Sequence, residues 1–98
     1  MVSTALENFV DESVRHFRES GYNPTAFNVM RKHYGTIGAI ERLVASGEIQ
    51  SGFIRLQQME LLDWTIEAAV LKFPREFSPN VRDAAQWRFE QARQEYHR

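Results

Sequence analysis

The sequence contains no cysteine among its 98 residues, which excludes a disulfide framework and any zinc site built on thiolates. It also lacks the run of about 18 apolar residues that a membrane-spanning helix requires. An excess of one charge is missing as well, since 12 basic and 13 acidic residues leave a net charge of −1. Nucleic-acid-binding domains typically carry a basic excess or a basic stripe. The first residues include acids and no basic cluster, unlike a signal peptide. We therefore expect a cytoplasmic protein without a membrane span.

The few prolines and glycines stand where helices begin and end. Asn23-Pro24 and Ser78-Pro79 each place a capping residue before a proline at the first helical position. Gly21, Gly35 and Gly47 each follow an apolar-periodic run, where a helix end requires a left-handed residue. No alternating strand pattern and no dividing linker is present. The sequence thus predicts an all-α fold, a compact single-domain bundle of five to six short helices over residues 1–98.

The helical spacing of apolar residues predicts six helices, with approximate bounds 3–20, 24–34, 37–46, 52–61, 64–73 and 79–96. The helix over 64–73 is apolar nearly all round, and Glu67 and Lys72 are its only charged residues. A helix of this kind belongs in the centre of a domain. We therefore expect Ile66 and Val70 in the core, and a cost of about 2–4 kcal/mol for Ile66→Ala.

Several sequence pieces together resemble a family of small bacterial helical proteins without an assigned function. They are Gly21-Tyr22-Asn23-Pro24-Thr25-Ala26-Phe27, Tyr34-Gly35, Ser51-Gly52-Phe53 and Leu62-Asp63-Trp64-Thr65-Ile66-Glu67-Ala68. The sequence departs from the family pattern at Thr36, where a second glycine is frequent, and at Gln57, where an aromatic residue is frequent. The resemblance implies an all-α fold and transfers no catalytic residue.

Residue patterns for catalysis and metal binding are sparse. The histidines His16, His33 and His97 are far apart, and none has a histidine three or four positions away. Glu67 in so apolar a helix is the strongest acid–base candidate, because burial shifts the pKa of a carboxyl group. An ion pair with Arg42 or Arg55 would give it a purely structural role. We expect no catalytic residues, no cofactor and no metal, and an enzyme ranks third among the functions considered.

A DNA-binding regulator is the second hypothesis. The helices predicted on either side of Gly35 form a possible helix-turn-helix at about residues 24–46. The basic residues available for nucleic acid are Arg31, Lys32, His33 and Arg42. The predicted recognition helix opens with residues that offer almost no hydrogen bonds to base edges. Binding of nucleic acid is therefore not the favoured function.

The aromatic residues carry the favoured hypothesis. At about 100° per residue, Trp87 lies on the opposite side of the last helix from the apolar stripe, which runs through Val81, Ala85, Phe89, Ala92 and Tyr96. Its neighbours on that side are Asp83, Glu90 and Gln94. Tryptophan is enriched at binding hot spots, whereas the alternative is that Trp87 folds back onto its own domain. We thus expect a protein–protein interaction module, with a protein partner or a second copy of the chain at Trp87. An accessory or inhibitory protein, such as a phage counter-defence protein, is one class that such a domain suits.

Overall fold

The computed structural model describes residues 3–45 and 51–96, without the side chains of residues 51, 52 and 93–96. Within this part of the chain every regular element is helical, so the predicted all-α fold is confirmed. The elements are α1 (Thr4–Glu19), α2 (Thr25–Val44), α3 (Ser51–Gln58), the 3₁₀ helix η1 (Leu62–Trp64), α4 (Ile66–Lys72), the 3₁₀ helix η2 (Pro74–Glu76) and α5 (Pro79–Tyr96). The predicted stop at Gly47 lies outside the described residues.

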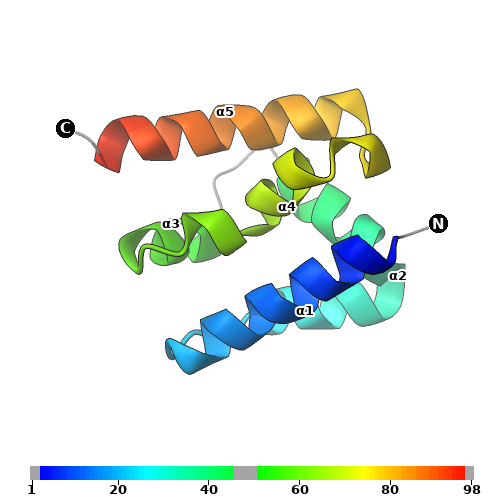
Figure 1. Ribbon diagram of the computed structural model, residues 1–98, viewed down its shortest axis with the longest axis horizontal. Helices are drawn as coiled ribbons and strands as arrows, with labels where there is room; N and C mark the ends of the chain where they lie inside the picture. The colour runs from blue at the N-terminus through cyan, green and yellow to red at the C-terminus, as the bar shows by residue number, and fades with distance from the viewer. Residues whose placement is uncertain (1–2, 46–50, 97–98) are drawn as a thin grey trace.

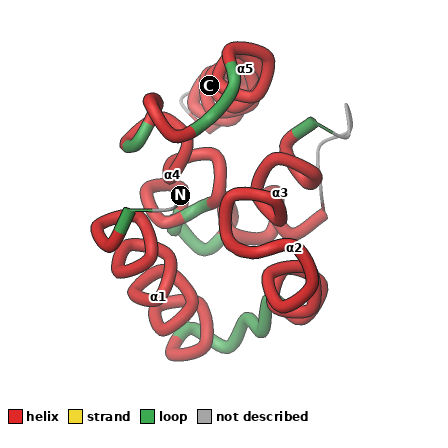
Figure 2. Tube along the Cα trace, turned by 90° about the vertical axis from the view of Figure 1, so that its right-hand side faces the viewer, coloured by secondary structure: helices red, strands yellow, loops and turns green. Residues whose placement is uncertain are grey.

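The short helix α4 occupies the centre of the bundle. It packs against α1, α2 and α5, with α5 lying across one side of it and α1 and α2 on the other (Figures 1 and 2). The buried residues of α4 are Glu67, Ala69 and Val70, so the prediction that this segment is central is confirmed. The helix is shorter than the predicted range of 64–73, because Thr65 caps it by accepting a hydrogen bond from the Ala68 amide at 3.1 Å.

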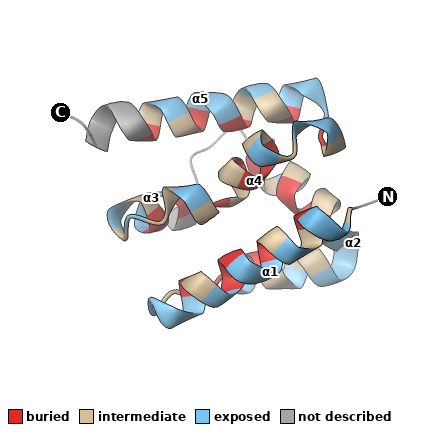
Figure 3. Cartoon of the chain, viewed as in Figure 1, coloured by how far each residue is buried: buried red, intermediate tan, exposed pale blue. Residues whose placement is uncertain are grey.

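The core follows from the buried faces of these helices, which turn toward one another (Figure 3). Its fully buried aliphatic residues include Leu6, Ile40, Val44 and Val70, each with no exposed surface. Ile66 lies only partly buried against this cluster. The radius of gyration is 12.5 Å, close to the value of about 13 Å expected for a folded chain of 100 residues.

Helix α1 ends as Gly21 predicts. The amide of Tyr22 donates to the carbonyl of Phe17 at 2.8 Å, and the amide of Gly21 donates to the carbonyl of Arg18 at 3.0 Å. These two bonds define a Schellman motif, with Gly21 at φ 90° in the position that disfavours other residues. The motif brings the rings of Phe17 and Tyr22 to a centroid distance of 5.9 Å. One wall of a pocket described below is fixed in this way.

Helix α2 contains the two helices that the sequence predicted on either side of Gly35. Two helical segments meet at a kink within Thr25–Val44, because Gly35 leaves helical geometry, at φ 79° and ψ 174°. This backbone region is essentially restricted to glycine. Gly35 therefore separates two helical segments, as the sequence predicted, without an intervening loop. The side chain of Thr36, directly after the kink, bonds to Glu7 of α1.

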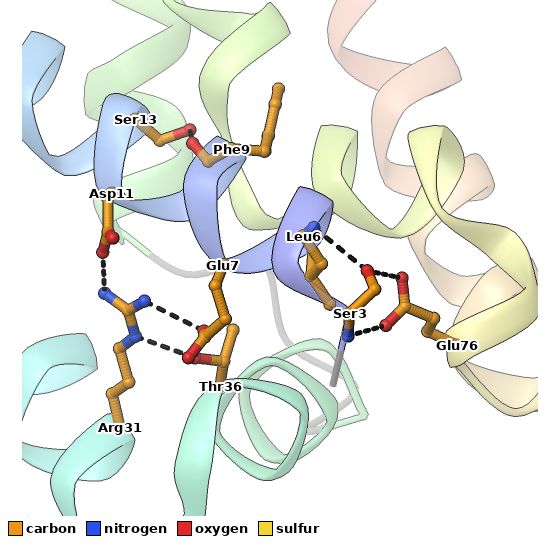
Figure 4. Close-up of polar contacts among 9 residues, drawn as sticks. All are labelled: Ser3, Leu6, Glu7, Phe9, Asp11, Ser13, Arg31, Thr36 and Glu76. Carbon is orange, nitrogen blue, oxygen red and sulfur yellow. Dashed lines mark hydrogen bonds and ion pairs between the residues drawn. The ribbon is translucent and has the colours of Figure 1, made fainter. Parts of the chain in front are cut away.

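Two polar contacts hold the start of α1 (Figure 4). Ser3 caps the helix by accepting a hydrogen bond from the Leu6 amide at 3.1 Å. The carboxylate of Glu76, in η2, accepts hydrogen bonds from the backbone amide and the hydroxyl of Ser3 at 2.8 and 2.6 Å. The first turn of α1 is thus anchored to a segment more than 70 positions away.

Candidate functional site

The surface around Trp87 lies where the sequence placed it. The side chain of Trp87 is 54% exposed, the highest exposure of any large hydrophobic residue among the described residues. Asp83 and Glu90, one turn before and one turn after it, are exposed as well. Gln86 donates a hydrogen bond to Glu90 at 3.1 Å. We call the outer face formed by Asp83, Trp87 and Glu90 the Trp87 face; the side chain of Gln94 lies outside the described residues.

The residues considered for nucleic acid do not form one basic surface. Arg31 is held by acidic residues of α1, with its Nη2 at 3.0 Å from Glu7 Oε1 and its Nη1 at 2.9 Å from Asp11 Oδ1 (Figure 4). Its Nε donates to the hydroxyl of Thr36 at 2.8 Å, and that hydroxyl donates to Glu7. The Thr36 hydroxyl and the Arg31 guanidinium hold the pKa of Glu7 below its ordinary value. The charge of Arg31 is thus compensated within the protein.

The other basic candidates are arranged differently. The guanidinium of Arg42 lies over the ring of Tyr34, 3.8 Å from its centroid. The ring of His33 lies 6.2 Å from that of Tyr34, and both His33 and Lys32 are exposed. Arg31, Lys32 and His33 lie on the segment before the kink at Gly35, and Arg42 lies on the segment after it.

A buried ion pair joins α4 to α5. Nη1 of Arg88 lies 3.2 Å from Oε2 of Glu67, and the two side chains are 2% and 1% exposed. The same nitrogen lies 3.3 Å from the backbone oxygen of Leu43, in the last turn of α2, where helix carbonyls lack partners within the helix. Arg88 therefore connects three helices. The predicted ion pair of Glu67 with Arg42 or Arg55 is wrong, because Arg42 stacks on Tyr34 and Arg55 is exposed.

Burial determines the protonation behaviour of Glu67. Removal of the carboxylate from water raises the pKa of Glu67 above its ordinary value, although its own backbone amide and Arg88 both favour the charged form. Glu67 also lines a pocket between the ends of α1, α2, α3 and α4. None of the described residues that line this pocket is a histidine.

Arg88 is the residue that the sequence analysis missed. Its signal was available, since Val81, Ala85, Arg88 and Ala92 follow helical spacing and all four are buried. The predicted stripe instead assigned this position on the helix surface to Phe89, which is only partly buried. An arginine at the same helical register as a valine and two alanines indicates a buried cation. Glu67, the only acidic residue of the predicted apolar helix over 64–73, is the expected partner of that cation.

The described residues offer little for metals or membranes. No group of three metal-ligating side chains gathers among them. The ring of His16 lies tilted against that of Trp64 at a centroid distance of 4.2 Å, and Nε2 of His16 lies 3.9 Å from Oε2 of Glu12. His97 lies outside the described residues. None of the helices in this part of the chain combines the length and the apolarity needed to cross a bilayer.

No protein-family model, curated protein or solved structure matches the chain.

Proposed function

We propose that this protein is a non-catalytic, cytoplasmic interaction module that binds a protein partner through the Trp87 face. The observation that carries the proposal is the 54% exposure of Trp87 on a helix whose opposite side buries Val81, Ala85 and Ala92. A large aromatic residue held in water exposes apolar area that a partner would cover, and tryptophan dominates the energy of many interfaces. Such a module would suit an accessory or inhibitory protein of a bacterium or phage.

The charges of the Trp87 face favour a different protein over a second copy of the chain. Asp83 and Glu90 flank Trp87 on both sides along the helix, and both are exposed. A twofold symmetric contact through this face would bring the same acidic residues of two copies together. Like charges that meet across an interface disfavour association. The partner that fits is a protein with an apolar pocket for an indole ring and basic residues around it.

Replacement of Trp87 with alanine tests the proposal. We expect an unchanged melting temperature, because the side chain of Trp87 is 54% exposed. Partner binding should weaken by about 30-fold or more, the loss typical of a hot-spot residue. Partners are captured from host lysate on immobilised protein and identified by mass spectrometry, and affinity is then measured with the purified partner. Tyr34→Ala is the matched control, since Tyr34 is 52% exposed on α2 and lies outside the Trp87 face.

Two results would contradict this proposal. One is a large loss of thermal stability in Trp87→Ala with capture intact, which would assign Trp87 to the core. The other is an equal loss of binding in Trp87→Ala and Tyr34→Ala. Analytical ultracentrifugation at increasing protein concentration distinguishes self-association from binding of a different protein. Self-association would produce dimers without any added partner.

DNA binding is expected to be at most weak and strongly salt-dependent, because Arg31 is compensated by Glu7 and Asp11. The measurement is a fluorescence-anisotropy titration with a labelled DNA duplex at low and physiological salt. Nanomolar, sequence-specific binding that is lost in Arg42→Ala would establish the regulator hypothesis instead.

A further inference from the structure

The two segments of α2 on either side of Gly35 differ in how deeply they are buried. The buried residues of the second segment, residues 36–44, are Thr36, Ala39, Ile40 and Val44, whereas the first segment, residues 25–34, buries Phe27 alone. Regions with few buried apolar contacts open locally at a lower free energy than the core does. The second segment therefore belongs to the core, and the first is attached to the core only lightly.

Non-helical backbone bounds the first segment at both ends. Residues 20–24 form no helix, and Gly35 has φ 79° and ψ 174°, in a region essentially restricted to glycine. No other helix of the described chain lies within 4 Å of the place that a Cβ atom would take at Gly35, so this joint is not packed against a neighbour. Isolated helices shorter than about 12–15 residues are marginal in water. Residues 25–34 therefore depend on docking to remain helical.

A polar network fastens the first segment across this joint (Figure 4). Arg31, before the joint, donates from Nη2 to Oε1 of Glu7 at 3.0 Å, and the hydroxyl of Thr36, after the joint, donates to the same oxygen. Nε of Arg31 also donates to the Thr36 hydroxyl at 2.8 Å. Since Thr36 is only 4% exposed and belongs to the core side, Glu7 ties the first segment to both α1 and the second segment.

The first segment also covers one side of the pocket beside Glu67, which has a volume of about 170 Å³. Ala26 and Phe27 of this segment line the pocket together with Phe53 and Leu56 of α3. Phe27, Phe53 and Leu56 are each less than 8% exposed. Movement of residues 25–34 away from the bundle would withdraw Ala26 and Phe27 and leave the walls from α3 in contact with water.

We propose that residues 25–34 form a flap that opens about Gly35 and uncovers the apolar pocket, and that Glu7 is the latch that holds the flap closed. The charged hydrogen bonds at Glu7 are stronger than neutral ones, and they join the two sides of the joint directly. Loss of this carboxylate therefore frees the first segment and leaves the core in place. The proposal does not depend on the Trp87 face.

Hydrogen exchange followed by mass spectrometry on the full chain tests the latch. Glu7→Gln removes the charge and keeps the shape of a side chain that is 40% exposed. Amide exchange in residues 25–34 should rise by about fivefold or more, as expected for weaker hydrogen bonds to this group, while exchange in residues 36–44 and in α4 stays unchanged. Glu12→Gln is the matched control, because Glu12 pairs with Arg15 and His16 of its own helix. It should change none of these rates.

A second variant acts from the other side of the joint. Thr36→Val removes the hydroxyl and keeps the buried shape, so it should give the same selective rise in residues 25–34. Opening of the pocket is followed with anilinonaphthalene sulfonate, which binds exposed apolar surface. Its emission should be stronger with Glu7→Gln than with Glu12→Gln or the unmodified protein.

Three results would overturn the proposal. The first is unchanged exchange in residues 25–34 in both latch variants. The second is a rise of equal size in residues 25–34, residues 36–44 and α4, which would show a general loss of stability and no separate flap. The third is faster exchange in residues 25–34 of Glu7→Gln without any gain in dye emission, because the flap would then not cover the pocket.

Discussion

Replacement of Arg88 with methionine is expected to lower the free energy of unfolding by about 3–5 kcal/mol, the cost of leaving a buried charge without its partner. The pair is the most deeply buried charged contact of the described residues, with both side chains at most 2% exposed. The variant also removes the hydrogen bond from Arg88 to the Leu43 carbonyl. Urea denaturation at pH 7, followed by circular dichroism, measures the loss.

The pH dependence identifies the cause of this loss. Burial raises the folded-state pKa of Glu67 above the ordinary value of 4.5. A group with a raised folded pKa contributes its stability fully below the unfolded pKa and loses it as the pH rises through the folded pKa. Removal of Arg88 raises the folded pKa of Glu67 further. The stability gap between Arg88→Met and the unmodified protein should therefore narrow as the pH falls from 7 toward 4.5.

The double variant Glu67→Leu with Arg88→Met is the matched control. Replacement of a buried ion pair by apolar residues of similar volume is often neutral or stabilising. We expect the double variant to recover most of the stability lost in Arg88→Met. Two results would contradict this account: a stability difference between Arg88→Met and the unmodified protein that does not change with pH, or a double variant as unstable as Arg88→Met. Either would show that the packing of the long Arg88 side chain, and not its charge, determines the loss.

The second large effect is expected at Ile40. This side chain has no exposed surface and lies in the central cluster. Ile40→Ala should cost about 3–4 kcal/mol, through lost burial and the cavity that remains. Thermal and urea denaturation measure it.

Ile66 provides the comparison for Ile40. Because Ile66 is only partly buried and lines the pocket beside Glu67, Ile66→Ala should cost about 1–2 kcal/mol. The sequence alone predicted a larger loss at this position. An equal or larger loss in Ile66→Ala than in Ile40→Ala would contradict the arrangement of the core.

Local signals predicted the fold well because each acts over a few residues. Gly21 predicted a left-handed helix end, and the Schellman motif confirms it. The spacing of the last helix placed Trp87 opposite the packed side, in agreement with its exposure. Gly35 predicted the break between the two helical segments of α2. The bond from the Thr36 hydroxyl to Glu7 of α1 is a tertiary contact, which local signals did not predict.

The candidate sites were harder to predict, because they depend on long-range pairing. The sequence suggested Arg42 and Arg55 as possible partners of Glu67, whereas helix packing selected Arg88, which lies 21 positions away. The pocket combines residues from four helices, so no sequence motif announces it. From the sequence, Arg31 was a candidate for contacting phosphate. The packing of α2 on α1 instead places its guanidinium beside the carboxylates of Glu7 and Asp11.

The proposed function rests on a Trp87 ring that is in water in the free protein and covered in the complex. The chain has two tryptophans, and Trp64 is the one stacked on Phe9, at a centroid distance of 5.3 Å. The variant Trp64→Phe keeps an aromatic ring there and leaves Trp87 as the only tryptophan. Its fluorescence then reports on Trp87 alone. We predict the emission of a water-exposed indole in the dilute free protein, and a blue shift with protection from acrylamide quenching when the captured partner is added. A blue-shifted, protected emission in the dilute free protein, or no change on addition of the partner, would contradict the proposal.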